Sequence, residues 1–284
     1  MTLHEHAARA RDQFTRAGIP PDEAALDARL LAQFLLGWDA ARFVTAGGES
    51  GPEDFSTQYH RLVERRAHRE PLAYIIGRRE FWGLDFEVSP AVLIPRPETE
   101  LIIETALELL PDRTAPFLVA DACTGSGCIA VALAREYPAS RIVATDLSSQ
   151  AIGVATRNVA AHGLASRITL LKADILLGTS ETFDLIVSNP PYVPDHDREA
   201  LQPEVRDYEP AIALFAGASG MAAITRLLEQ ATARLAPHGQ LVFEFGFGQA
   251  SAVEGLIGRT SGLTMVGLRH DLQTIPRVAI ARRT

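Results

Sequence analysis

From residue 117 to residue 282, short apolar segments alternate with longer segments that have helical spacing. The apolar segments predict strands at 117–122, 141–145, 168–171, 183–188 and 240–245, with a final strand pair within 263–282. The segments between them predict helices at 129–136, 150–162, 220–235 and 249–258. Because strands separated by helices pair in parallel through crossover connections, we predict an α/β fold with a doubly wound, mostly parallel sheet of seven strands.

Residues 1–77 have a different pattern, which predicts a small helical domain. A helix is expected to start at Pro20 and Pro21 and to end at Gly37. The residues that recur along one face of this helix are Leu26, Leu30, Phe34 and Leu35.

A second amphipathic segment of the same domain carries a set of arginines. Its apolar residues are Phe55, Tyr59, Leu62 and Val63, and its arginines are Arg61, Arg65, Arg66 and Arg69. We expect these arginines to form a solvated face. Contact with an acidic or RNA-bound partner is the alternative.

Residues 78–95 alternate around Gly83, which predicts a β-hairpin linker. The expected boundaries are therefore a helical domain at 1–77, the linker at 78–95 and the α/β domain at 96–284.

The composition of the 284 residues narrows the function classes. Broad nucleic-acid binding leaves a basic surface, whereas this chain has a net charge of −8 and a pI near 5.5. Cys123 and Cys128 are too few for a disulfide framework or a metal site, and we expect small buried side chains. No apolar run approaches the roughly 18 residues needed to span a membrane, and no signal peptide is evident, so we expect a soluble cytoplasmic protein.

A glycine-rich turn, with the sequence DACTGSGCIA from Asp121 to Ala130, follows the first expected strand. Gly125 and Gly127 would let the backbone turn sharply and approach a ligand at the start of the next helix. Asp146 ends the second strand, about twenty residues further on, where a carboxylate accepts ribose hydroxyls. A dinucleotide and S-adenosylmethionine (AdoMet) both fit this turn, and a turn without a ligand is the third alternative.

The end of the third strand gives a weaker indication of the same kind. Asp174 would accept a hydrogen bond from an adenine amino group, and Ile175 would cover the ring. A plain turn is an equal alternative, because Asp is common after strands.

The fourth strand ends in Asn189, Pro190, Pro191 and Tyr192. The two prolines stiffen the backbone and fix the directions of its carbonyl groups. The Asn189 side-chain oxygen and the Pro190 carbonyl would converge as acceptors on an NH₂ group, with the Tyr192 ring against its planar carrier.

This arrangement suits methylation of a weakly nucleophilic nitrogen. An amide nitrogen shares its lone pair with its carbonyl group, and two acceptors on its N–H bonds would favour loss of that conjugation. Both hydrogen bonds would strengthen as the nitrogen becomes positive. The four strand ends together favour AdoMet-dependent nitrogen methylation over hydride transfer.

These residues resemble the peptide chain release factor N5-glutamine methyltransferases, the HemK/PrmC family. The resemblance is carried by the turn 121–128, by Asp146 and by residues 189–192. Further similar segments are 95–100, 208–217, 243–246 and the helix from Leu26 to Gly37. The resemblance implies a Rossmann-like methyltransferase domain, a helical substrate-recognition domain and the glutamine of the Gly-Gly-Gln loop of class I release factors as the substrate.

The resemblance also implies roles by position. AdoMet, and its product S-adenosylhomocysteine, would be held by Asp121, Cys123, Thr124, Gly125, Ser126, Gly127, Asp146, Leu147, Asp174, Ile175 and Asn189. The substrate amide would be held by Asn189, Pro190, Pro191 and Tyr192, with Arg96, Thr99 and Glu100 near the site. For those last three a capped helix start is the alternative. Ile175 departs from members with an aromatic residue there, which puts adenine stacking in doubt.

Three other functions remain open from the sequence. A related group methylates a glutamine of a ribosomal protein, and amino-methyltransferases that act on nucleobases share the Asn/Asp-Pro-Pro-Tyr motif. The latter usually add a basic patch, which the acidic chain does not suggest, so no direct nucleic-acid partner is expected. A cofactor-binding interaction protein without turnover is the third.

Overall fold

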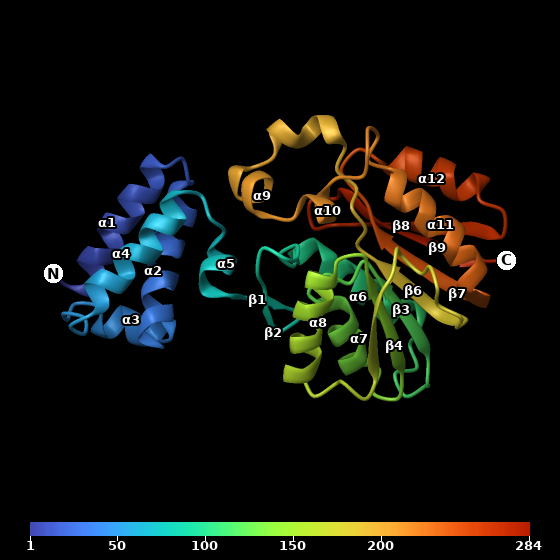
Figure 1. Ribbon diagram of the computed structural model, residues 1–284, viewed down its shortest axis with the longest axis horizontal. Coiled ribbons are helices and arrows are strands. Elements are labelled where there is room, and N and C mark those ends of the chain that lie inside the picture. The colour runs from blue at the N-terminus through green and yellow to red at the C-terminus, as the bar shows by residue number, and fades with distance from the viewer. The chain divides into compact units, whose positions relative to one another are not determined.

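The computed structural model describes all residues from Met1 to Thr284, in two compact units. The helical unit consists of Met1–Gly77 together with Gln202–Tyr208. The sheet unit consists of Arg78–Leu201 together with Glu209–Thr284 (Figure 1). The segment 202–208, which the sequence placed in the α/β domain, thus packs with the helical unit.

Five helices from the N-terminal part and one from the later segment build the helical unit. They are α1 (Leu3–Arg16), α2 (Pro21–Leu36), α3 (Ala40–Ala46), α4 (Phe55–Ala67), α5 (Leu72–Ile76) and α9 (Pro203–Tyr208). Thr2 caps α1 in a reciprocal pair with Glu5, and Gly37 ends α2 in the left-handed conformation. Leu3, Phe14 and Leu31 are among the side chains of its buried core.

The buried face of α2 differs from the face predicted by its large apolar residues. Leu26 and Phe34 are 44% and 39% exposed, whereas Ala28, Leu31 and Ala32 are buried. Small alanines allow α2 to pack closely, so the core-facing stripe is marked by Ala rather than by the largest side chains.

The solvated arginine face is wrong for Arg66, whose side chain is only 1% exposed. Its guanidinium donates to Asp27 at 2.6 Å, to Glu204 at 2.8 Å and to Glu23 at 2.9 Å. Arg69 also pairs with Glu204, at 2.6 Å. Three carboxylates compensate the buried charge of Arg66. They lie too far from Arg66 in the sequence for a local pattern to reveal these contacts.

The sheet unit begins with the predicted hairpin, formed by β1 (Arg78–Phe81) and β2 (Leu84–Glu87). Its main sheet has the strand order β5-β4-β3-β6-β7-β9-β8. The strands are β3 (Leu118–Ala122), β4 (Arg141–Asp146), β5 (Ile168–Lys172), β6 (Phe183–Ser188), β7 (Leu235–Glu244), β8 (Leu263–His270) and β9 (Pro276–Arg283). The first five are parallel and β9 pairs antiparallel with both neighbours, so the predicted fold class is confirmed.

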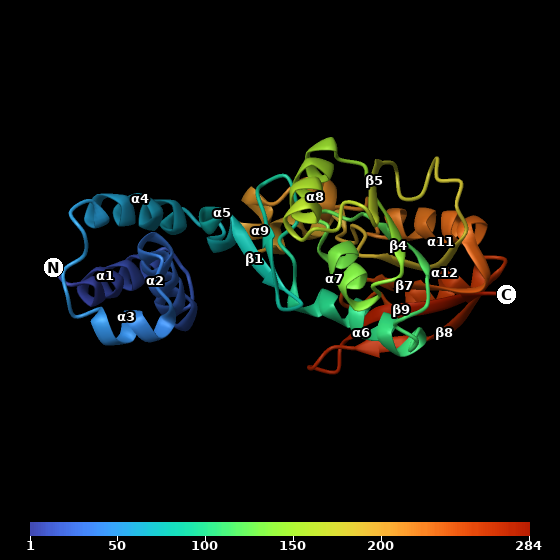
Figure 2. The ribbon, with the colours of Figure 1, turned by 90° about the horizontal axis from the view of Figure 1, so that it is seen from below.

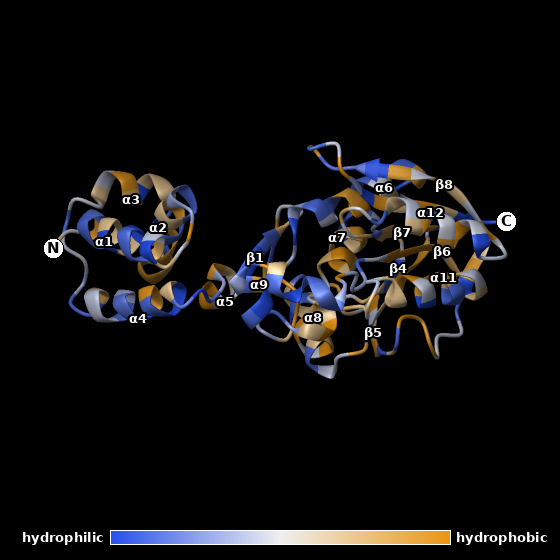
Figure 3. Cartoon of the chain, turned by 90° about the horizontal axis from the view of Figure 1, so that it is seen from above, coloured by the Kyte–Doolittle hydropathy of each residue, from blue (hydrophilic) through white to orange (hydrophobic).

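Helices cover both faces of this sheet. One layer holds α6 (Glu100–Leu109), α7 (Cys128–Glu136) and α8 (Ser149–Ala161), and the other holds α11 (Ala222–Arg234) and α12 (Ala250–Arg259) (Figure 2). Alternate strand residues divide between the layers: Leu185 and Val187 belong to the first core and Ile186 to the second. Figure 3 shows the resulting hydrophobic colour of the central strands, including β6.

The long connection after β6 contains structure that the sequence did not predict. The short helices of this connection are η2 (Asp195–Ala200) and α10 (Ala211–Leu214), besides α9, and a further short helix, η1 (Pro97–Thr99), directly precedes α6. They are too short to show a helical period in the sequence. No helix of the structure combines the length and apolar character that crossing a membrane requires.

Candidate active site

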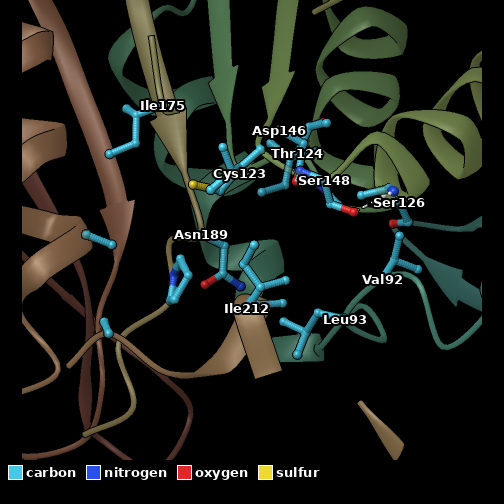
Figure 4. Close-up of a pocket in the computed structure, with 18 of the residues that line it drawn as sticks. Val92, Leu93, Cys123, Thr124, Ser126, Asp146, Ser148, Ile175, Asn189 and Ile212 are labelled. Carbon is cyan, nitrogen blue, oxygen red and sulfur yellow. Dashed lines mark hydrogen bonds between the residues drawn. The ribbon is translucent and has the colours of Figure 1, made fainter. Parts of the chain in front are cut away.

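A pocket of about 300 Å³ lies at the carboxyl ends of the parallel strands. Its lining includes the turn after β3, residues 146–148 after β4, residues 174–175 after β5, and Asn189 after β6. Strand order reverses between β3 and β6, which is where open α/β sheets bind ligands. Figure 4 shows Asn189 opposite the turn that carries Cys123 and Thr124, with Ile212 and Leu93 close by.

The glycine turn has the conformation that its composition predicts. Gly125 and Gly127 have φ angles of +55° and +82°, and Cys123 also lies in the left-handed region at +61°. A Cβ on Gly127 would meet Ala155 Cβ at 3.3 Å, so this position favours glycine twice over. Burial raises the pKa of the Cys123 thiol to about 12, so this side chain is an uncharged part of the pocket wall.

Asp121 lies beneath the turn and is fully buried, so it does not line the pocket itself. Its Oδ2 accepts from Thr124 Oγ1 at 2.5 Å and from the Ala130 N–H at 3.1 Å, whereas its Oδ1 has no hydrogen-bond partner. Burial raises its pKa to about 7. An unpartnered buried acceptor suits a ligand that brings a positively charged donor to the turn.

Asp146 connects the end of β4 to the turn. Its Oδ2 accepts from the Gly125 N–H at 2.9 Å and its Oδ1 from the Ser148 N–H at 2.8 Å. Burial raises its pKa. Each oxygen retains lone-pair capacity for a hydroxyl group. Leu147, which is 49% exposed, lines the pocket beside it.

Asp174 and Ile175 both line the pocket. Ile175 has a φ of +59°, an unusual conformation for a β-branched residue, and its carbonyl accepts from the Thr145 hydroxyl. Asp174 lies 3.4 Å from Arg226, a pocket residue that the sequence analysis did not single out.

Asn189 and Pro191 line the pocket, whereas Pro190 and Tyr192 do not. Asn189 Nδ2 donates to Thr99 Oγ1 at 2.9 Å. The Tyr192 hydroxyl donates to Glu244 at 2.9 Å, and its ring packs against the core on the α11–α12 side of the sheet. Tyr192, predicted as an aromatic wall, is therefore not among the residues that line the pocket, and Glu244 holds its hydroxyl.

Arg96 and Thr99 line the pocket, but Glu100 does not. Glu100 accepts the Trp82 N–H of the hairpin at 2.8 Å, and no side-chain cap forms at Thr99. Arg96 pairs with Glu209, whose carboxylate also accepts the Ile94 N–H at 3.2 Å. Burial raises the pKa of Glu209, and the Arg96 charge opposes this rise.

The sequence reasoning did not assign a site role to Glu244, Glu209 or Arg226. Each contacts a site residue that is distant in sequence: Glu244 contacts Thr99, and Glu209 contacts Arg96. The segments 208–217 and 243–246 were noted through the resemblance alone. No spacing rule links residues 145 positions apart, so the fold was needed to join them.

Comparisons with known proteins identify relatives of this chain. Residues 5–77 match the family model "PrmC N-terminal domain", and residues 100–205 match the "Methyltransferase small domain". Proteins named release factor glutamine methyltransferase are similar over nearly their whole length. The chain is 41% identical to that of Koribacter versatilis, covering 91% of each chain, and 46% identical to that of Geobacter sulfurreducens, covering 84% of this chain and 83% of the relative.

Solved structures with low sequence identity share the fold. A methyltransferase from Pyrococcus furiosus has a TM-score of 0.51 at 19% identity, over 80% of this chain and 98% of that one. A 16S rRNA methyltransferase of T. thermophilus, in complex with AdoMet and guanosine, has a TM-score of 0.52 at 19% identity, over 73% of this chain and 50% of that one.

Proposed function

The chain belongs to the family of release factor glutamine methyltransferases, and we propose that it methylates the side-chain amide nitrogen of the glutamine in the Gly-Gly-Gln loop of a class I peptide chain release factor. The observation that carries this proposal is the position of Asn189. Its carboxamide lines the same pocket as the glycine turn and Asp146, at the strand ends where the fold places its chemistry.

AdoMet is the methyl donor that suits these residues. Asp121 lies buried beneath the turn with its Oδ1 unpartnered, and its carboxylate would attract the ammonium group of AdoMet electrostatically. The two oxygens of Asp146 would accept the ribose hydroxyls, and Leu147 and Ile175 supply apolar surface for the adenine. When bound, AdoMet supplies an electrophilic methyl group on a sulfonium sulfur, and S-adenosylhomocysteine is the product.

The residues after β6 would hold the substrate amide. Asn189 Oδ1 would accept one N–H bond of the glutamine side chain, and we propose the Pro190 carbonyl oxygen as the acceptor for the other, although Pro190 is not among the residues that line the pocket. These bonds draw the nitrogen lone pair out of conjugation with its carbonyl group and strengthen as the nitrogen becomes positive, so they stabilise the transition state more than the ground state. The nitrogen then loses a proton to water, and no general base is assigned.

Two other substrates would fit the same pair of acceptors, which we call the amide clamp, and the test below distinguishes them. A ribosomal-protein glutamine offers the same amide, and a nucleobase amino group offers a similar NH₂. The match of residues 5–77 to the PrmC N-terminal domain and the identity of 41–46% to proteins named release factor glutamine methyltransferase support a release factor over both.

The test is incubation of the purified protein with AdoMet labelled in its methyl group and with four separate acceptors. The acceptors are a release factor, a ribosomal protein preparation, RNA and DNA. We expect label on the release factor. Label on one of the other acceptors alone would overturn the proposed substrate, and AdoMet binding without label on any acceptor would support a non-catalytic protein.

A further inference from the structure

We propose that Glu244, acting through Thr99, is a positioning residue that fixes which end of the Asn189 carboxamide faces the substrate. The inference rests on the proposed function, in which Asn189 has to offer an oxygen atom to the substrate amide. Glu244 does not line the pocket and would act through its two hydrogen-bond partners.

An asparagine side chain poses an orientation problem in this site. Its oxygen accepts and its NH₂ donates, and a half-turn about the last bond exchanges them with almost no change of shape. The substrate amide also presents an NH₂ group. If the NH₂ of Asn189 faced it, donors would oppose donors and the clamp would fail.

The hydrogen-bond chain behind Asn189 solves this problem. Glu244 ends β7 and is 2% exposed, and a carboxylate in its ionised form only accepts hydrogen bonds. The single hydroxyl proton of Thr99 is donated to Glu244 Oε2 at 2.7 Å. Thr99 Oγ1 therefore has only lone pairs left, and it accepts from Asn189 Nδ2 at 2.9 Å. The NH₂ of Asn189 is thus held against Thr99, and Oδ1 is the atom that remains for a ligand.

The same carboxylate also holds the other end of the motif. Tyr192 donates its hydroxyl proton to Glu244 Oε1 at 2.9 Å. Glu244 therefore positions both Asn189, through Thr99, and Tyr192, which are the first and last residues of the motif. Both donors to Glu244 are hydroxyls, which are weak compensation for a buried charge. A carboxylate at this position is understandable if an acceptor-only group is required.

A glutamine in place of Glu244 would occupy the same space, but it could not accept hydrogen bonds at both ends as the carboxylate does. Its NH₂ would face either Thr99 or Tyr192. If it donated to Thr99, the threonine proton would turn to Asn189, and Asn189 would present its NH₂ to the substrate. If it faced Tyr192 instead, the Gln oxygen would still accept from Thr99 and Asn189 would keep its orientation. The inference therefore predicts that Glu244→Gln lowers turnover less than Thr99→Val does, although it barely changes packing.

The first experiment separates the Thr99 hydroxyl from its shape. Thr99→Val should lower kcat about 10- to 100-fold, the usual range for residues that orient a contacting group, whereas Thr99→Ser should stay within about threefold of the unchanged protein. AdoMet affinity, measured by calorimetry, should change less than about threefold in both. Thr105→Val is the matched control, because Thr105 is equally buried in α6 but donates to the Leu101 carbonyl. Equal losses for Val and Ser at position 99 would overturn the inference.

The second experiment tests the route through Asn189 with a double-mutant cycle. Single-turnover rates with excess enzyme would be compared for Thr99→Val and Glu244→Gln, each alone and combined with Asn189→Ala. We expect Thr99→Val to slow the unchanged protein at least about tenfold and Glu244→Gln to slow it by a smaller factor. Both should slow the Asn189→Ala variant by less than about twofold, since the group they orient is gone. Losses of equal factor in both backgrounds would show that Thr99 and Glu244 act elsewhere.

Failure of the inference and failure of the proposed function are distinguishable. The proposed function fails if the unchanged protein does not methylate a release factor. The cycle concerns relative rates, so it is run on whichever amide or amino acceptor the unchanged protein does methylate.

Discussion

Glu204 and Glu244 are both buried carboxylates, but their surroundings differ in kind. Glu204, in the helical unit, accepts from two guanidinium groups, those of Arg66 at 2.8 Å and Arg69 at 2.6 Å. Glu244, in the sheet unit, accepts from two hydroxyls. The first is matched by opposite charge and serves folding. Glu244 is compensated mainly by the dipoles of two hydroxyl groups, which indicates a role in the active site rather than in stability.

The pKa values of these two acids move in opposite directions. Burial raises the pKa of Glu204, but hydrogen bonds from Arg69 and Arg66 more than offset this, so the net pKa is lowered. Burial also raises the pKa of Glu244, and the hydrogen bonds from Thr99 and Tyr192 do not cancel it, so the net pKa is raised. The Glu244 charge in turn raises the pKa of the Tyr192 hydroxyl well above its ordinary value, which keeps that hydroxyl a donor.

The largest effect should come from removing the cation of the helical unit. Arg66→Met leaves Asp27 and Glu204 buried without their shared partner, which costs about 3–5 kcal/mol for a buried pair. Hydrogen exchange across residues 1–77 would report this loss within the helical unit. Arg65→Met is the control on the same helix, since Arg65 is 44% exposed and pairs with Glu70 at the surface. Similar losses of stability for both substitutions would show that the buried ion pairs of Arg66 contribute no more than a surface ion pair.

In the sheet unit, the largest effect should be on catalysis rather than stability. Asn189→Ala should lower turnover about 100- to 1,000-fold, the range for one lost acceptor or donor in the transition state, with AdoMet affinity within a few-fold. Steady-state kinetics and calorimetry would measure the two quantities. Unchanged turnover would rule out the amide clamp.

Asp146 differs from both Glu204 and Glu244, because its hydrogen-bond partners are backbone N–H groups. Asp146→Ala should weaken AdoMet binding about 10- to 100-fold, because hydrogen bonds to a charged group contribute about 1.5–3 kcal/mol. Calorimetric titration with AdoMet would measure this. An affinity equal to that of the unchanged protein would argue against ribose binding by Asp146.

The smallest effect, and the one of opposite sign, is expected from Glu244→Gln on stability. Because the folded-state pKa of Glu244 is raised, its contribution to stability is greatest at pH below the unfolded pKa and falls as the pH rises through the folded pKa. At neutral pH the neutral amide should therefore leave the free energy of unfolding unchanged or raise it by about 1 kcal/mol, while turnover falls. Urea unfolding at pH 7 and near pH 5 would measure the effect.

Glu204→Gln provides the matched control for this sign. The folded-state pKa of Glu204 is lowered, so its stabilising contribution is present above the unfolded pKa and is lost as the pH falls through the folded pKa. This variant should be less stable at pH 7 than the unchanged protein. Stability changes of the same sign in both variants would show that the two acids do not differ as described.

Local patterns in the sequence were sufficient for much of the fold and for the pocket wall. Strand and helix periods located β3 to β6 closely, and the glycine turn, Asp146 and Asn189 do meet at one pocket. The family resemblance is confirmed by relatives that are 40–46% identical. These features are local because each lies within a strand, a turn or a motif whose residues are adjacent.

The features that the sequence did not reveal depend on contacts between distant segments. Arg66 looks like one more surface arginine until α9 brings Glu204 to it, 138 positions later in the chain. Tyr192 was expected against the substrate, but it does not line the pocket, and its hydroxyl is held by Glu244, 52 positions away in the sequence. A buried polar group is recognised by its partner, and the partner is supplied only by the fold.

The most direct test of the proposed chemistry is to locate the transferred methyl group. A release factor treated with the protein and AdoMet would be digested, and the peptide that contains its Gly-Gly-Gln loop would be sequenced by tandem mass spectrometry. We predict one added methyl group on the side-chain amide of that glutamine, absent when Asn189→Ala replaces the unchanged protein in a short incubation. A methyl group on any other residue, or an unmodified loop after complete reaction, would contradict the account.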